Sequence, residues 1–177
     1  MDITEFFELS AGKWFSQRTV HNLTSGQLQA GKSELKIDLL PANDPAVTKL
    51  CEQHAINPSQ AGLAGARATW NVMADLHQTN GSKVMVLIPN PDNSNSGKLL
   101  QDKIASRYTL GNDVLTLITE SDTLYVEERW WYLMPNLRLR SSIVKQLNGL
   151  AQASFCSEIR MGVTQPPAET VSATTQK

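Results

Sequence analysis

Two short segments of the chain carry apolar residues at helical spacing. Residues 2–10 gather four apolar side chains on one face, and Gly12 ends the pattern. Residues 45–55 show the same spacing after Asp44-Pro45, which combines an N-cap with the proline of a first helical turn. The sequence therefore predicts two short helices.

Much of the remaining chain mixes or alternates apolar and polar residues, most clearly at Leu35, Ile37 and Leu39. Alternation is typical of strands that bury one face. The predicted strands span residues 14–23, 34–39, 65–77, 83–90, 99–110, 113–120, 123–134, 137–145 and 151–161. Turn residues separate most of them, and Asn80-Gly81 is the strongest hairpin signal. About nine or ten strands with two short helices favour an all-β fold, an up-and-down antiparallel β-barrel that can enclose one small ligand.

The pattern predicts one domain and a tail. The barrel domain is expected over residues 1–162, and the chain of 177 residues is long enough to bury a sizeable core there. Residues 163–177 are rich in Gln, Pro, Ala, Thr and Ser and have no hydrophobic period. We therefore expect a disordered C-terminal tail.

The composition excludes several classes of function. The net charge is −1, so no basic excess supports binding to nucleic acid. The longest apolar run, residues 84–88, is far shorter than the ~20 residues that span a bilayer. The N-terminus has no basic stretch and no apolar signal core. We expect a cytoplasmic protein that binds neither nucleic acid nor membrane.

The cysteines and histidines form no recognisable reactive site. Cys51 and Cys156 give neither a disulfide framework nor a zinc site, and both are expected to be reduced thiols. The three histidines have neither metal-ligand nor catalytic-triad spacing. No metal and no cofactor are expected.

Arg138 and Arg140 alternate with leucines, so both guanidiniums share one face of a predicted strand. Neighbouring arginines repel each other unless they are solvated or lie in a cavity that receives anions. A carboxylate ligand would justify the cavity, because arginine binds carboxylates through a planar fork of donors. Arg18 lies four residues after Trp14 on the same face. Either Arg18 points inward and needs a carboxylate from the protein or a ligand, or strand twist turns it outward.

Trp70 and Trp131 lie on other predicted strands, where they either belong to the core or sandwich a flat conjugated ligand. Glu127 and Arg129 share the face of Trp131. An inward Trp131 would place Glu127 in an apolar pocket, where a carboxyl group has a raised pKa and can donate a proton. The alternative is a plain salt bridge between Glu127 and Arg129.

One face of the last predicted strand carries Ser154, Glu158 and Arg160. Ser154 is a candidate ligand contact, and Glu158 is a second candidate proton donor. The Gly12-x-Trp14 motif resembles the lipocalin signature, in which the tryptophan closes one end of a barrel and an arginine of the last strand packs over its ring. Arg160 fits the place of that arginine.

With these motifs in view, the chain resembles the S-type phycobiliprotein lyases of cyanobacteria over residues 2–162. The resemblance lies in the Gly-Lys-Trp start, Glu-Glu-Arg-Trp-Trp-Tyr at 127–132, Pro-Asn-Leu-Arg-Leu-Arg at 135–140 and Ala-Ser-Phe-Cys-Ser-Glu-Ile-Arg-Met-Gly at 153–162. It implies a barrel similar to lipocalins and fatty-acid-binding proteins. It also implies a lyase that binds phycocyanobilin or a similar open-chain tetrapyrrole as its substrate. The lyase would attach this bilin through a thioether bond to a cysteine of a phycobiliprotein subunit, of the phycocyanin or allophycocyanin type.

The resemblance gives the candidate residues their roles. Glu127 or Glu158 would protonate the pyrrole nitrogens, and the nucleophile would belong to the acceptor protein. The arginines would hold propionates, and the tryptophans would lie against the rings. The candidate ligand-binding residues are Arg18, Trp70, Arg129, Trp131, Arg138, Arg140 and Ser154.

The residues leave other functions open. The arginines and tryptophans also fit a non-catalytic, lipocalin-like carrier of a hydrophobic ligand that bears a carboxylate. A third alternative is a structural subunit whose strand edges pair with a partner. Exposed barrel edges or helices would also allow a homodimer.

Overall fold

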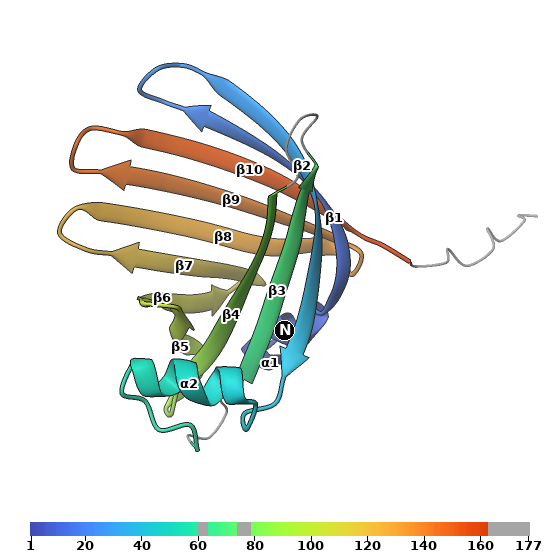
Figure 1. The fold of residues 1–177 in the computed structure, drawn as a ribbon, viewed down its shortest axis with the longest axis vertical. Helices are drawn as coiled ribbons and strands as arrows, with labels where there is room; N and C mark the ends of the chain where they lie inside the picture. Colours follow the sequence, from blue (N-terminus) through green and yellow to red (C-terminus); the bar gives the residue numbers. More distant parts are fainter. Residues whose placement is uncertain (60–63, 74–78, 163–177) are drawn as a thin grey trace, which may run out of the picture.

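Ten antiparallel strands close into a barrel in the computed structural model, which describes residues 1–59, 64–73 and 79–162 (Figure 1). The strands follow one another around the ring in chain order, and β1 closes it by pairing with β10. The predicted up-and-down barrel with two short helices is confirmed. The predicted tail, residues 163–177, lies outside the described residues.

Both helices and most strands lie close to the positions that the sequence predicts. The elements in chain order are α1 (Ile3–Leu9), β1 (Gly12–Asn22), β2 (Leu28–Leu40), α2 (Pro45–Gln53), β3 (Ala64–Met73), β4 (Thr79–Asn90), β5 (Asn93–Gln101), β6 (Ile104–Gly111), β7 (Val114–Glu120), β8 (Leu124–Met134), β9 (Leu137–Gln146) and β10 (Ala151–Arg160).

The single strand predicted over residues 99–110 is wrong. The chain forms two strands there, because β5 ends at Gln101 and β6 begins at Ile104. Asp102 has a φ of 47° in the intervening turn. Aspartate tolerates this left-handed conformation better than most residues, so Asp102-Lys103 makes a two-residue hairpin turn without glycine.

The hairpin predicted at Asn80-Gly81 is also wrong, because both residues lie inside β4. Gly81 pairs with Trp70 of β3, and a Cβ at position 81 would overlap the indole of Trp70. The glycine therefore makes room for a large side chain on the neighbouring strand. The end of the strand predicted over 65–77 lies partly outside the described residues.

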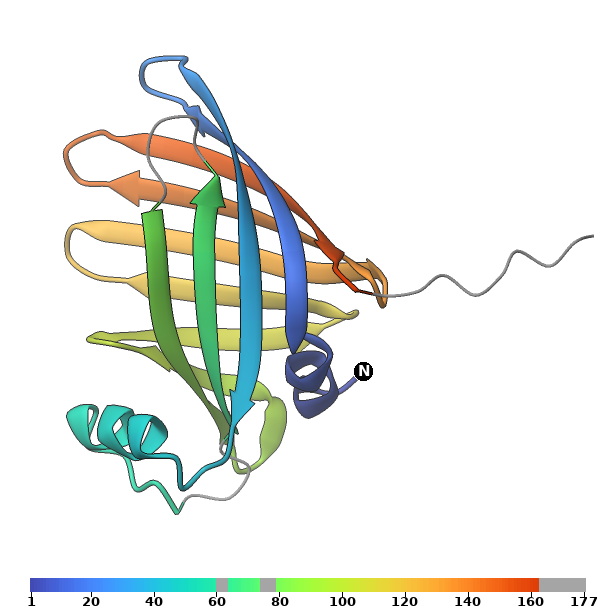
Figure 2. The ribbon, with the colours of Figure 1, turned by 45° about the vertical axis from the view of Figure 1, so that its right-hand side comes forward.

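One end of the barrel is closed by α1 and a Trp–Arg pair. Asp2 and Glu5 form a capping box that begins α1, and the apolar face of this helix packs into the barrel core. Figure 2 shows α1 next to the start of β1. Trp14 is fully buried, and its indole N–H donates to the Ser10 carbonyl at 2.9 Å. The Arg160 guanidinium lies 4.2 Å from the Trp14 ring and donates to carbonyls at the end of α1. The predicted packing of Arg160 over Trp14 is confirmed.

A second apolar core lies outside the barrel, under α2. Val47, Leu50 and Cys51 of the helix pack against the outer faces of β4 and β5. Beside α2, the wall therefore carries apolar residues on both faces, with Met85, Leu87 and Leu99 on the inner one. No helix in the described part of the chain is long and apolar enough to span a membrane.

Candidate functional site

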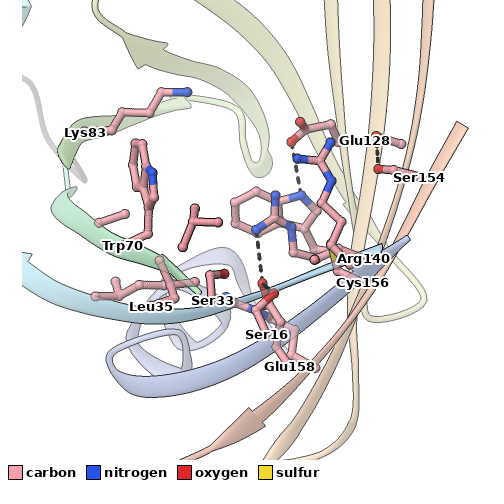
Figure 3. Close-up of a pocket in the computed structure, with 18 of the residues that line it drawn as sticks. Ser16, Ser33, Leu35, Trp70, Lys83, Glu128, Arg140, Ser154, Cys156 and Glu158 are labelled. Atoms are coloured by element: carbon pink, nitrogen blue, oxygen red, sulfur yellow. Dashed lines mark hydrogen bonds and ion pairs between the residues drawn. The ribbon is translucent and has the colours of Figure 1, made fainter. Parts of the chain in front are cut away.

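A cavity of about 490 Å³ occupies the barrel interior beyond the closed end (Figure 3). Its volume lies within the range of small-molecule sites, roughly 300–1,000 Å³. Side chains from every strand except β6 and β7 line it, including Arg18, Trp70, Arg140 and Ser154. With Arg138 and Glu158, which also line the cavity, the structure brings six predicted site residues to one hollow.

A buried ion cluster forms the floor of the cavity. Glu158 of β10 pairs in register with Arg138 of β9, and these side chains are 1% and 0% exposed. Arg138 Nε donates to Glu158 Oε2 at 2.5 Å, and Arg140 Nη1 donates to Oε1 at 3.2 Å. Ser16 Oγ reaches the same Oε1 at 3.5 Å. Both oxygens of Glu158 are thereby occupied.

The floor has more donors than acceptors. Arg138 Nη1 and Nη2 and Arg140 Nε are buried, and none of them bonds to any residue that the structure describes. The Arg138 guanidinium instead lies over the rings of Trp14, at 4.8 Å, and Trp130, at 5.4 Å. The face of an aromatic ring attracts a cation. It is, however, a weaker hydrogen-bond acceptor for guanidinium N–H groups than an oxygen atom is. A further hydrogen-bond acceptor beside the cluster would give these nitrogens a partner.

Nearby carboxylates keep the guanidinium of Arg140 protonated. Burial lowers the pKa of its guanidinium, but Glu158 and Glu128 outweigh burial and raise it above its ordinary value. The side chain is 29% exposed, and its guanidinium lies 4.5 Å from the Trp130 ring. Arg140 is thus a charged group that a ligand in the cavity can reach.

Two tryptophans face each other across the cavity. Trp70 lies on β3 and Trp130 on β8, and these strands are five positions apart in both directions around the ring. The Trp130 indole N–H donates to Glu128 Oε2 at 3.2 Å. The predicted pair of indole walls is present, but with Trp130 in place of Trp131.

The expected orientation of β8 is wrong. Glu127, Arg129 and Trp131 lie on its outer face, away from the cavity. Glu127 accepts from Tyr125 Oη and from Arg129 Nε, each at 2.8 Å, and these bonds lower its pKa. The alternative interpretation, a salt bridge between Glu127 and Arg129, is confirmed. Trp131 packs against Phe155 with ring centroids 6.5 Å apart.

A register shift next to the β8–β9 turn explains this error. Met134 pairs with Leu137 across the turn, and a regular ladder from this pair would place Trp131 opposite Arg140. The ladder shifts between Tyr132 and Met134, so Trp130 stands opposite Arg140 instead. A shift of one residue turns every side chain upstream to the other face. Glu128 and Trp130, which the sequence interpretation missed, are therefore the inward residues.

The cavity carries an excess of positive charge. Five cationic side chains and two acidic ones line it, in a chain whose net charge is −1. The basic residues are Arg18, Lys32, Lys83, Arg138 and Arg140, and the acidic residues are Glu128 and Glu158. An excess of this sign favours an anionic ligand. No sequence motif identifies Lys32 or Lys83, because a single lysine on a strand has no characteristic spacing.

Two further side chains complete the wall. Ser154 Oγ lies 2.7 Å from Ser142 Oγ of the neighbouring strand. Cys156 also lines the cavity, and burial raises the pKa of its thiol, although Arg140 partly opposes this effect. A protonated thiol is a weak nucleophile, so the structure gives no sign of an activated cysteine here.

An up-and-down barrel that is closed at one end and holds a charged, tryptophan-walled cavity has the architecture of lipocalin-like proteins. The profile of the CpeS-like protein family matches residues 2–161, so the chain belongs to this family.

Individual relatives resemble the chain over nearly its whole length. Chromophore lyase CpcS/CpeS 1 of Trichodesmium erythraeum is 52% identical over 170 residues, which cover 90% of this chain and 98% of the relative. The phycocyanobilin lyase subunit CpcS of Picosynechococcus sp. is 36% identical, and the match covers 98% of this chain and 93% of that subunit. The solved structure of the S-type phycobiliprotein lyase CPES from Guillardia theta is similar with a TM-score of 0.83 at 31% identity, covering 93% of this chain and 95% of that one.

Proposed function

We propose that this protein is a chromophore lyase that binds phycocyanobilin or a similar open-chain tetrapyrrole in the barrel cavity. It attaches the bilin through a thioether bond to a cysteine of a phycobiliprotein subunit. The named relatives support the lyase activity. The observation that carries the substrate class is the cationic excess between two opposed indoles in one cavity.

A bilin matches these two features of the cavity. Its conjugated pyrrole rings fit against the faces of Trp70 and Trp130, which are stacking surfaces for flat ligands. Its two propionates need cationic partners, and Arg140 is charged and partly exposed. Arg18 is a further cation on the same wall, two strands away from Arg140 in the ring.

Glu128 takes the role that the sequence suggested for Glu127. One of its oxygens accepts from Trp130, and the side chain faces the cavity. A carboxylate beside the pyrrole nitrogens stabilises the protonated chromophore, and protonation makes the ethylidene group a better electrophile. Glu158 is a positioning residue in this proposal, because both its oxygens already hold guanidiniums.

The reaction is an addition. The thiolate of the acceptor attacks the ethylidene carbon of the first ring, one S–C bond forms, and the π bond of the ethylidene is consumed. The proton released by the thiol ends on the bilin, so no oxidant or reductant is needed. This chain contributes a fixed conformation and one accessible face of the bilin, which is catalysis by orientation.

A transfer assay tests the proposal. The purified protein is mixed with phycocyanobilin and an apo-phycobiliprotein subunit, and the acceptor is analysed by mass spectrometry and absorbance. We expect faster formation of one adduct at one cysteine than in a mixture without the protein. Binding of the bilin without acceleration or selectivity would support the carrier instead. The choice of bilin and acceptor, the homodimer and the cytoplasmic location stay predictions.

A further inference from the structure

Lys83 lines the cavity from β4, a strand that contributes no other cation to the cavity lining. It lies on the inward face of β4, opposite Ala68 of β3. Pairing between β4 and β5 begins only at Met85 and Gln101, so Lys83 lies where β3 is the one neighbour of β4 among the described strands. Figure 3 shows Lys83 beside Trp70, across the cavity from Arg140.

The ammonium group of Lys83 has no partner within the part of the chain that the structure describes. The side chain is half-buried, and it makes neither an ion pair nor a hydrogen bond with those residues. Burial lowers its pKa, Arg140 lowers it further, and Glu128 and Asp102 only partly oppose them. Burial removes part of the water around this cation, so a carboxylate of a ligand would replace the lost hydration.

Lys83 and Arg140 approach the cavity from opposite directions. Strands β4 and β9 are five positions apart in both directions around the ring. A ligand with one carboxylate meets only one of these walls, whereas a ligand with two separate carboxylates can reach both. The arrangement thus favours a dicarboxylate over a simple fatty acid.

We propose that Lys83 is a second carboxylate-binding residue, which holds one propionate of the bilin while Arg140 holds the other. This inference rests on the proposed function, since it takes the bilin as the ligand. It assigns the two carboxylates to opposite walls and so fixes the orientation of the central rings between Trp70 and Trp130.

Titrations of phycocyanobilin, followed by bilin absorbance, test this assignment. Lys83→Met keeps the length of the side chain and removes the charge, and it should weaken binding about tenfold. Lys83→Arg should restore most of the affinity. Lys98→Met is the matched control, because Lys98 is exposed on the neighbouring strand β5 and does not line the cavity. The melting temperature of Lys83→Met should equal or exceed that of the unaltered protein, whereas a structural lysine would lower it.

The dimethyl ester of the same bilin identifies the group that Lys83 binds. Lys83→Met and the unaltered protein should bind the ester equally, because the ester has no carboxylate left to lose. An equal loss for acid and ester would assign Lys83 to a ring oxygen and overturn the inference, as would unchanged binding of the acid. If the unaltered protein binds no phycocyanobilin at all, the proposed function fails and this inference fails with it.

Discussion

Arg138 and Arg140 lie two residues apart on the same face of β9, yet they belong to different regions of the barrel. Arg138 is fully buried between the closed end and the cavity floor, where it pairs with Glu158 and lies over Trp14. Arg140 is 29% exposed and reaches the open part of the cavity. The same residue type thus lies in a buried ion cluster in one region and faces the open cavity in the other.

The two regions also differ in how far their cations are open to the cavity. The Trp14 indole and the Arg160 guanidinium bond to backbone carbonyls at the end of α1, so the closed end needs no ligand. The cavity wall instead presents the half-buried side chains of Lys83 and Arg140 to the open space. Exposure therefore separates the two arginines better than partnering does: Arg138 has two unpartnered nitrogens among the described residues but is fully buried, whereas Arg140 is open to the cavity.

The largest expected effect is on stability at the floor. Arg138→Met leaves Glu158 buried with only one guanidinium partner, and we expect the free energy of unfolding to fall by about 3 kcal/mol. Urea denaturation measures it. Arg129→Met, on the exposed outer face of β8, should change stability by less than about 1 kcal/mol. Equal effects of the two changes would contradict the distinction between floor and surface.

The second-largest effect is expected on the rate of bilin transfer, from Glu128 in the cavity wall. Glu128→Gln removes the inward carboxylate and should slow thioether formation about a hundredfold. Glu127→Gln is the matched control on the outer face and should leave the rate within about twofold. A loss of red-shifted absorbance of the bound bilin in Glu128→Gln would show that the protonated form has lost its counter-charge. Equal transfer rates for the two variants would contradict the role of Glu128 beside the pyrrole nitrogens.

Alkaline pH should weaken the closed half of the barrel. Burial raises the pKa of Tyr108 to about 12, whereas an unfolded tyrosine has a pKa of about 10. The neutral phenol therefore stabilises the fold fully below pH ~10, and this contribution of about 2–3 kcal/mol is lost as the pH rises toward ~12. Unfolding in urea across this window should show the loss, and Tyr108→Phe should lack this component. An identical pH dependence in both proteins would refute the assignment to Tyr108.

The smallest effect is expected at Arg140. Arg140→Met should weaken bilin binding about tenfold, because one charge-assisted contact to a propionate is lost. Stability should change much less than in Arg138→Met, since Glu158 keeps its shorter bond to Arg138. Absorbance titration and urea denaturation of both variants provide the test. A stability loss as large as that of Arg138→Met would make Arg140 a structural residue as well.

The barrel could be predicted from the sequence because its signals are local. Alternation shows which segments are strands, and Asp44-Pro45 begins α2 where expected. The predicted strand boundaries were wrong at two places, where the local structure is not the one most common for the residue type. Asp102 turns the chain without glycine, and Gly81 serves the packing of Trp70 rather than a turn.

The site could be predicted only in part, because the register between neighbouring strands decides which side chains point into the barrel. Arg138, Arg140 and Glu158 face the interior together, as their shared strand faces suggest, since no register shift separates β9 from β10. One shift between Tyr132 and Met134 reversed all of β8 and exchanged Trp131 for Trp130. No residue type marks such a shift reliably, so the three-dimensional structure is needed to find it.

A crystal structure of the protein with phycocyanobilin tests the central claim most directly. We predict that the rings lie between Trp70 and Trp130, with one propionate within hydrogen-bond distance of Arg140. A bilin bound on the outer face against Trp131 and Arg129, with the cavity left empty, would contradict the account.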